Sequence, residues 1–152
     1  MILTTEYKPE YREQTLRLVK EFEDEYFGEF GLETNLEAFD EAIDELKNSC
    51  FILIIDGEIQ GALAGTIVKS FCAPGLTWHE TLWYVRKPYR QSFYGLDLFE
   101  KACETLKARG VRQMMTAHLA NDVGKKMGRL YKSLGFKEFE THYIKRFDDG
   151  NN

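Results

Sequence analysis

The stretch between residues 84 and 96 concentrates residue types that could bind a phosphate. Arg86, Lys87 and Arg90 place positive charge just after an apolar run, and Gly95 stands where a helical pattern begins. The N-terminus of a helix offers unpaired backbone N–H groups and the positive end of the helix dipole, and a glycine there lets a ligand approach closely. The segment therefore predicts an anion site for a phosphorylated cofactor. An ordinary basic loop that caps a sheet is the alternative interpretation.

A second group of residues suits a cation instead. The N-terminal third is much more acidic than the rest of the chain, and it interleaves carboxylates with aromatic rings. Carboxylates attract a cationic amine by Coulomb forces, and the faces of aromatic rings attract it by cation–π interaction. Solvated faces of acidic helices are the alternative. The residues concerned are Glu21, Glu23, Asp24, Glu25, Tyr26, Phe27, Glu29, Phe30 and Glu33.

Hydrophobic periodicity predicts the elements that position these residues. The order is β-α-α-β-β-β-α-β-α-β, which makes a mixed α/β (α+β) fold around a central sheet. Tight turns imply antiparallel pairing in the middle of that sheet, and the strand-helix-strand unit over 77–119 implies one parallel crossover. The predicted strands are 2–7, 50–55, 58–71, 77–85, 113–119 and 136–147, and the predicted helices are 11–26, 35–47, 95–109 and 122–134.

Composition excludes several classes of protein. A chain of 152 residues with 43% hydrophobic residues fits one globular domain, here 1–147, followed by a disordered tail, 148–152. No apolar run approaches the roughly 18 residues of a membrane span, and no signal peptide is evident, so we expect a cytoplasmic protein without a membrane partner. Three scattered cysteines without a CxxC motif predict neither a disulfide framework nor a metal site. Bases in the C-terminal half are helix-spaced and mixed with acids, so no nucleic-acid partner is expected.

The loop after residue 85 resembles the acetyl-CoA pyrophosphate loop of the GNAT N-acetyltransferase superfamily, whose pattern is Arg/Gln-x-x-Gly-x-Gly/Ala. Arg90 fills its first position and Gly95 its last, while Phe93 stands in place of the middle glycine. The resemblance implies a three-layer fold with a mostly antiparallel mixed sheet between helices. It also implies that acetyl-CoA is the co-substrate. The cofactor-binding residues it predicts are Trp83, Tyr84 and Val85, on the strand that pairs with the pantetheine arm, and Arg90, Gln91, Ser92, Phe93, Tyr94, Gly95 and Leu96.

A second segment, Leu130–Phe136, is similar to the "LYxxLGF" sequence of the same family. In the family its tyrosine lies near the thioester sulfur and acts as general acid, a role that the resemblance gives to Tyr131. Family members often carry an asparagine about seven residues earlier that contacts the CoA arm. The nearest asparagine here is Asn121, ten residues before the tyrosine, and it completes the predicted cofactor-binding set.

Acetyl transfer requires that the amine lose a proton and that the leaving thiolate gain one. Family members often place a carboxylate on the strand 77–85, so the resemblance makes Glu80 the leading candidate for general base and His79 the second. Successive side chains of a strand alternate, so only one of the two can face a cleft. Either could instead be an ordinary surface residue. His118, at the end of the next predicted strand, is a third candidate.

The resemblance also places the first two helices and their loop beside the acceptor. Tyr26, Phe27, Glu29 and Phe30 are therefore expected to bind the substrate. The predicted function is direct transfer of acetyl from acetyl-CoA to a primary, cationic amine through a ternary complex. The acceptor would be a small molecule or a lysine-containing peptide, and the sequence leaves a homodimer open. The alternative is a GNAT-like binding or regulatory protein without activity.

Overall fold

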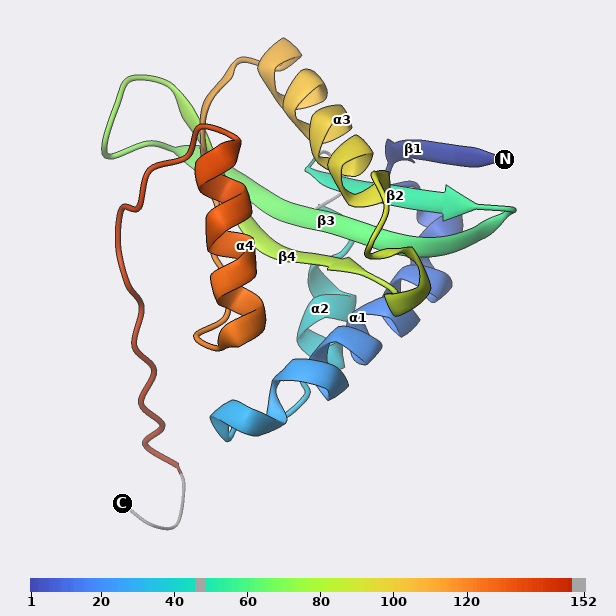
Figure 1. The fold of residues 1–152 in the computed structure, drawn as a ribbon, viewed down its shortest axis with the longest axis horizontal. Helices are drawn as coiled ribbons and strands as arrows, with labels where there is room; N and C mark the ends of the chain where they lie inside the picture. Colours follow the sequence, from blue (N-terminus) through green and yellow to red (C-terminus); the bar gives the residue numbers. More distant parts are fainter. Residues whose placement is uncertain (46–48, 149–152) are drawn as a thin grey trace. The chain divides into compact units, whose positions relative to one another are not determined.

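The computed structural model describes residues 1–45 and 49–148, which form two compact units, one from Met1 to Thr116 and one that begins at Ala117. The first unit contains a five-stranded sheet in the order β1-β2-β3-β4-β5 (Figure 1). Strands β1 to β4 are antiparallel neighbours, whereas β4 and β5 run parallel, as predicted. The elements are β1 (Ile2–Glu6), α1 (Arg12–Tyr26), α2 (Leu36–Ala42), β2 (Cys50–Ile55), β3 (Glu58–Lys69), β4 (Leu76–Val85), α3 (Tyr94–Ala108) and β5 (Val111–Met115).

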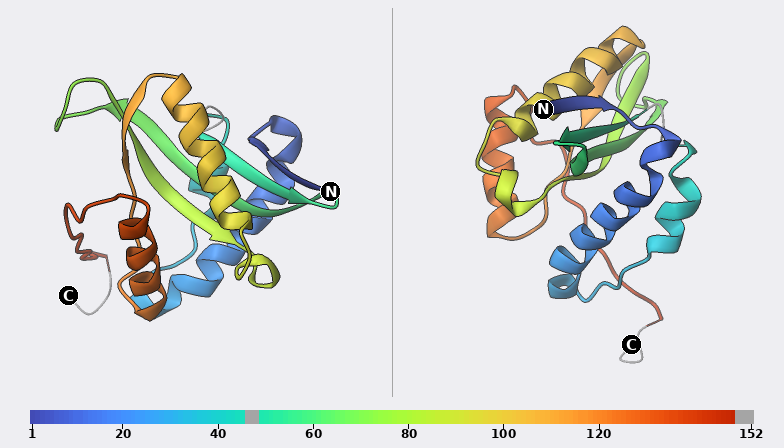
Figure 2. Two further views of the ribbon diagram at one scale, coloured as in Figure 1. Left: turned by 45° about the horizontal axis from the view of Figure 1, so that its top comes forward. Right: turned by 90° about the vertical axis from the view of Figure 1, so that its right-hand side faces the viewer.

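Helices α1 and α2 cover one face of this sheet, and α3 covers the other (Figure 2). Alternation along β2 supplies both faces with apolar side chains. Cys50 and Ile52 join Leu18 and Val19 of α1 in one buried cluster. Phe51 and Leu53, which point the other way, are also fully buried. The first unit is therefore a three-layer arrangement in which β3 is the central strand of the sheet.

Local sequence explains the main turn and one helix start. Asp56 and Gly57 both have positive φ, 51° and 84°, which is the type I′ geometry that suits a two-residue hairpin between β2 and β3. Asn35 caps α2, because its side-chain oxygen accepts from the N–H of Ala38 at 3.3 Å. The prediction that this helix runs to Lys47 is not met by the described residues, since α2 ends at Ala42; residues 46–48 lie outside the described part.

In the second unit, the Leu130–Phe136 segment forms a helix end. Helix α4 (Asp122–Ser133) stops where Gly135 adopts a φ of 95°. The N–H of Phe136 donates to the carbonyl of Tyr131 at 3.0 Å, and the N–H of Gly135 donates to that of Lys132 at 3.1 Å. The rings of Tyr131 and Phe136 pack at 5.4 Å between centroids. This is a Schellman cap with its hydrophobic contact, so the motif has a structural cause of its own.

The predicted last strand is wrong for this structure. Within the described residues, 136–148 contains no helix or strand, and Phe139, Tyr143, Ile144 and Phe147 are exposed. Alternating apolar residues form a strand only when a neighbouring strand completes the hydrogen-bond ladder, which this segment does not have among the described residues. None of the described helices is long and apolar enough to span a bilayer.

Candidate active site

The ladder between β4 and β5 stops before β4 does. Its last register pair joins His79 to Met115, while β4 continues to Val85 along β3. Thr81 is an extra residue in β4, because Ala64 pairs with Leu82 and Gly65 with Glu80. Such a bulge bends a strand and increases its twist. The two strands therefore stop pairing next to Glu80, and the second half of β4 leads directly into the predicted phosphate loop.

The edge of β4 beyond this point can be identified from its hydrogen bonds. The N–H of Arg86 donates to the carbonyl of Gln60, on the β3 side, at 2.9 Å. Amide groups alternate along a strand, so those of Tyr84 also face β3 and those of Trp83 and Val85 face the β5 side. The guanidinium of Arg90 donates to the Val85 carbonyl, which agrees with this assignment. The backbone amide groups of Trp83 and Val85 thus lie on the edge of β4 that, by the resemblance, pairs with the pantetheine arm.

The start of α3 has the properties of an anion site. Its N-cap residue, Phe93, makes no side-chain capping bond. The Ser92 hydroxyl donates to the Tyr89 carbonyl at 2.6 Å and accepts weakly from the N–H of Tyr94 at 3.4 Å. The first hydrogen bond of the helix is the one from the Asp97 N–H to the Phe93 carbonyl. The N–H groups of Gly95 and Leu96 lie in the first turn, where no intrahelical acceptor exists.

Phe93 is compatible with this geometry although the family pattern has glycine there. Its φ of −76° and ψ of 0° are values that any residue adopts, so the position does not require glycine. Its side chain is 79% exposed. Gly95 is different, because a Cβ there would stand 3.9 Å from both Trp83 Cζ2 and Val85 Cγ2, beside the last residues of β4. Packing within the protein therefore permits a side chain at position 95. A ligand that passes from β4 to α3 would be in contact with that side chain.

The basic side chains of the loop after β4 form ion pairs with carboxylates of α1. Arg86 makes two bonds to the Glu21 carboxylate, at 2.8 and 3.0 Å, and Arg90 approaches Glu25 at 2.9 Å. Lys87 lies 3.8 Å from Glu25 as well. The positive charge of the predicted basic loop is therefore largely neutralised by carboxylates of α1. The groups that remain to attract a phosphate are mainly the backbone N–H groups at the start of α3.

The aromatic residues of β4 divide between the two faces of the sheet. The Trp83 ring stacks on Phe99 of α3, with centroids 5.5 Å apart. Tyr84 points to the other face, where it contacts the rings of Phe22 and Tyr26 of α1 and lies under the Arg90 guanidinium at 4.9 Å. The structure thus brings together one residue predicted for the acceptor, Tyr26, and two predicted for the cofactor.

The two candidate bases lie on opposite sides of β4. His79 pairs with Thr66 and is the last residue of β4 in the ladder with β5, while Glu80 pairs with Gly65 and is the first residue beyond it. Both side chains are partly buried. Glu80 is therefore the candidate that stands where the strands part.

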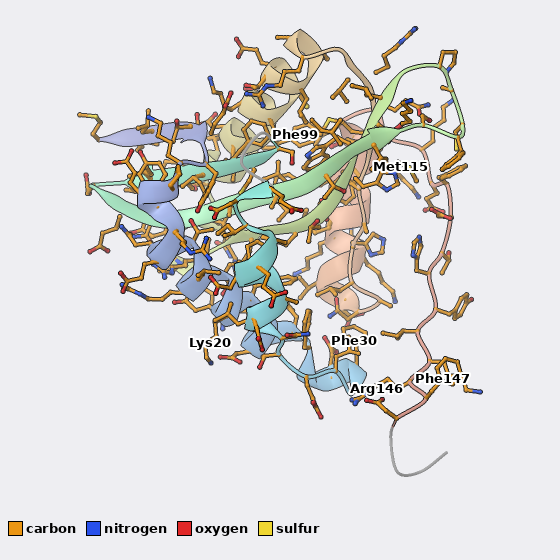
Figure 3. All side chains as sticks on the ribbon, turned by 180° about the vertical axis from the view of Figure 1, so that it is seen from behind. Lys20, Phe30, Phe99, Met115, Arg146 and Phe147 are labelled. Carbon is orange, nitrogen blue, oxygen red and sulfur yellow. The ribbon has the colours of Figure 1, made fainter. Side chains whose placement is uncertain are left out.

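The predicted acceptor residues follow one another at the end of α1. Tyr26 is the last residue of that helix; burial, followed by its hydrogen bond to Glu25, raises the pKa of Tyr26 to about 12. Phe27 packs edge-on against Phe22 at 5.7 Å. Glu29 is exposed, and Phe30 is partly buried at the end of a 3-10 turn beyond α1 (Figure 3). Only part of this set therefore remains accessible to a ligand.

In the second unit, the predicted site residues have structural partners. The Tyr131 hydroxyl donates to the carbonyl of Ala117 at 3.1 Å, and the residue is buried. Asn121 caps α4 by accepting from the N–H of Gly124 at 2.7 Å. His118 places Nδ1 2.9 Å from the Leu119 carbonyl, so Nδ1 carries the proton in the neutral ring.

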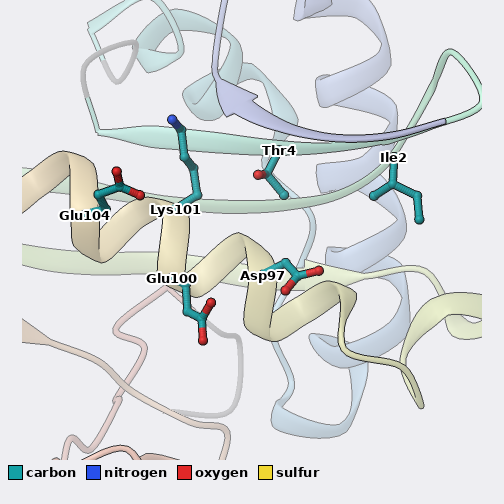
Figure 4. A pocket seen from close by; sticks show the side chains of 6 residues that line it. All are labelled: Ile2, Thr4, Asp97, Glu100, Lys101 and Glu104. Carbon is teal, nitrogen blue, oxygen red and sulfur yellow. The ribbon is translucent and has the colours of Figure 1, made fainter.

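A groove between β1 and α3 does not suit the cofactor. Its lining contains three carboxylates and one ammonium group, so it would repel a pyrophosphate (Figure 4). The lining residues are Ile2, Thr4, Asp97, Glu100, Lys101 and Glu104. Cysteine chemistry is not favoured either, because burial raises the pKa of Cys50 to about 12 and also raises that of Cys103.

Sequence reasoning did not identify Glu21 and Glu25 as partners of the loop. It grouped them with the acids that would attract an amine, yet both are engaged by the loop cations. Their spacing of four residues, which puts them on one face of α1, was the available signal. The bulge at Thr81 had no signal in the sequence.

Comparison with known proteins agrees with this geometry. The family model described as "Acetyltransferase (GNAT) family" matches residues 15–136. No curated protein sequence matches the chain. The fold is similar to an aminoglycoside acetyltransferase from an uncultured soil metagenomic sample, with TM-score 0.73 and 21% identity over 97% of this chain and 99% of the other.

Two further solved structures share the fold. One is AAC(6')-Iy in complex with the bisubstrate analog CoA-S-monomethyl-acetylneamine, with TM-score 0.76 and 17% identity over 96% of this chain and 97% of that one. The other is glucosamine-6-phosphate N-acetyltransferase from Arabidopsis thaliana, with TM-score 0.71 and 15% identity over 97% and 99% of the two chains. The family match and the fold together confirm the resemblance seen in the sequence: the chain belongs to the GNAT acetyltransferase family.

Proposed function

We propose that this protein transfers the acetyl group of acetyl-CoA to a small-molecule primary amine. The observation that carries the proposal is the end of the β4–β5 ladder at His79, after which β4 continues alone with β3 and leads into the N-terminal turn of α3. An extended arm can run along this part of β4 toward α3, and its pyrophosphate can accept from the N–H groups of Gly95 and Leu96. Acetyl-CoA has both parts.

In this proposal Glu80 takes the proton of the amine, directly or through a water, with His79 as the second candidate. Glu80 is favoured because it is the residue at which β4 leaves the ladder. Tyr131 gives a proton to the leaving thiolate, and the resemblance of its segment to the family is the support for that role. We propose that transfer is direct: burial raises the pKa of the buried Cys50 and of the partly buried Cys103, so these two thiols are poor nucleophiles for an acetyl-enzyme.

We propose a cationic acceptor that approaches from the end of α1. Phe27 and Phe30 lie there, both only partly buried, and the faces of their rings can attract a cation. The acids of α1 itself contribute less than their number suggests, since Glu21 and Glu25 are paired with the loop. Among proteins of this fold, acetyltransferases of aminoglycosides and of glucosamine-6-phosphate are found, which supports a small-molecule amine. A lysine-containing peptide is the second acceptor class.

We further propose that residues 1–147 act as one acetyltransferase domain, because the family match runs without interruption from residue 15 to residue 136. The inactive alternative rests on Phe93 and on the shifted position of Asn121; the ordinary backbone conformation of Phe93 supports the active enzyme over that alternative.

Initial-rate kinetics tests the function. Acetyl-CoA and a panel of amines are varied together, and release of free thiol is measured. Intersecting double-reciprocal lines with polyamines or aminoglycosides support direct transfer to a cationic amine. Parallel lines would indicate an acetyl-enzyme instead, and reaction with neutral or acidic amines alone would contradict the acceptor class.

A further inference from the structure

Glu25 stands at the centre of a cluster that ties α1 to the loop after β4. Its carboxylate accepts from Arg90 Nη2 at 2.9 and 3.2 Å, and Lys87 Nζ lies at 3.8 Å. The neighbouring Tyr26 side chain also lowers the pKa of this carboxylate. The side chains of Glu25 and Arg90 are only 22% and 29% exposed. Burial raises the pKa of Glu25, but the hydrogen bonds from Tyr26 and Arg90 outweigh it and bring that pKa below its ordinary value.

Arg90 is held from three sides. Its Nε donates to the carbonyl of Val85, its Nη2 binds Glu25, and its guanidinium lies 4.9 Å from the centre of the Tyr84 ring. A guanidinium presents its donors in a fixed plane, so these contacts determine its orientation. Its Nε is thereby bonded to β4 and its Nη2 to α1. Arg90 fills a position that the sequence predicted to touch phosphate, yet the fold uses it as a link between two elements.

We propose that Glu25 is a positioning residue for acetyl-CoA: through Arg90 it fixes the loop that joins β4 to α3, and so the N–H groups at the start of α3. The inference rests on the proposed function for its ligand. The dependence of the loop conformation on Glu25 does not require the proposed function. Glu25 immediately precedes Tyr26, so the same contact joins the proposed acceptor segment to the cofactor loop.

The proposal predicts the opposite sign from simple electrostatics. A carboxylate near a pyrophosphate site repels the ligand and also neutralises a basic side chain that could attract it. If charge alone mattered, Glu25→Gln would release Arg90 and tighten binding of acetyl-CoA. If Glu25 positions the loop, the same change weakens binding, because the N–H groups of Gly95 and Leu96 lose their fixed geometry.

The test compares Glu25→Gln with Glu13→Gln. Glu13 is a matched control, because it also lies on α1 and pairs with a basic residue, Arg17, at 2.8 Å, but on an exposed surface. We expect Glu25→Gln to raise the Kd for acetyl-CoA about fivefold or more, within the usual range of coupling between sites. The KM for acetyl-CoA should rise while kcat changes little. Glu13→Gln should leave all three values unchanged.

Arg90→Gln and the double variant separate positioning from direct contact. We expect Arg90→Gln to weaken binding as much as Glu25→Gln does, and the double variant to be no weaker than either. If Arg90 touches phosphate directly, its loss would cost far more than the loss of Glu25. Tighter binding by Glu25→Gln would also overturn the proposal.

Hydrogen exchange in the protein without ligand provides a readout that does not depend on acetyl-CoA. Backbone amides between residues 86 and 96 should exchange faster in Glu25→Gln than in the wild type, and at the wild-type rate in Glu13→Gln. Unchanged exchange would refute the positioning role even if the wild type binds acetyl-CoA. Faster exchange in a protein that fails to bind acetyl-CoA would uphold the positioning role and refute the proposed function.

Discussion

Replacement of Gly95 by alanine should raise stability and lower affinity for acetyl-CoA. Gly95 is the second residue of α3, and no left-handed backbone angle is required there. An added methyl group would make ordinary contacts at 3.9 Å with Trp83 and Val85. Glycine to alanine at a compatible position stabilises a protein by about 0.4–1 kcal/mol. For a chain of this size, that predicts a Tm higher by about 1–4 °C.

The same methyl group would lie between α3 and the last residues of β4, on the path proposed for the cofactor. There it would displace a pyrophosphate from the N–H groups of the first turn. Loss of one hydrogen bond to a charged group costs about 1.5–3 kcal/mol, so the Kd for acetyl-CoA should rise about 10- to 150-fold. A change with opposite effects on stability and binding cannot be explained by a general loss of structure.

Differential scanning calorimetry and isothermal titration with acetyl-CoA measure the two effects. Glu104→Ala is the control, because Glu104 lies on the same helix and is exposed. It should leave the affinity unchanged. A lower Tm for Gly95→Ala would contradict the packing described above. Unchanged affinity would show that the ligand does not pass beside Gly95.

Other predictions concern the chemistry and the buried groups. Glu80→Gln should lower kcat by about 100-fold, and the loss of the acidic limb of its pH–rate profile would confirm Glu80 as the base, while an unchanged profile would exclude it. Tyr131→Phe should reduce kcat about 10-fold or more if the phenol protonates the thiolate, with stability lower by about 1 kcal/mol from the lost bond to the Ala117 carbonyl. Burial raises the pKa of Glu23, so the ionised carboxylate lowers the free energy of unfolding at neutral pH, and this loss of stability disappears as the pH falls and the group is protonated. Glu23→Gln should therefore raise the Tm at pH 7 and have less effect on it at pH 4. With an alkylating reagent at pH 8, the exposed Cys72 should react at once and the buried Cys50 only after unfolding, as mass spectrometry of the labelled peptides can show.

Local patterns predicted most of the fold. The apolar runs, the Asp56-Gly57 turn and the cap at Asn35 are local signals, so most elements were found close to their observed bounds. The helix predicted over 35–47 is shorter, since α2 ends at Ala42, and the strand predicted over 113–119 lies at Val111–Met115. The parallel crossover from β4 to β5 followed from the helix between them. The segment 136–147 failed because a strand depends on its neighbour as much as on its own residues.

The site was predicted less completely, because its geometry depends on residues far apart in the chain. The sequence located the loop and Gly95, but the pairing of Glu25 with Arg90 spans 65 positions. Without that contact, both residues seemed free to bind ligands of opposite charge. The end of the β4–β5 ladder likewise depends on a bulge at Thr81, and no residue type in the sequence predicts a bulge at that position.

The most direct test of the central claim is titration of the wild-type protein with acetyl-CoA, followed by thiol release in the presence of a cationic amine. We predict binding with a Kd on the order of micromolar and amine-dependent release of CoA. Failure to bind acetyl-CoA, with the protein folded, would contradict the claim that the edge of β4 and the first turn of α3 form its site.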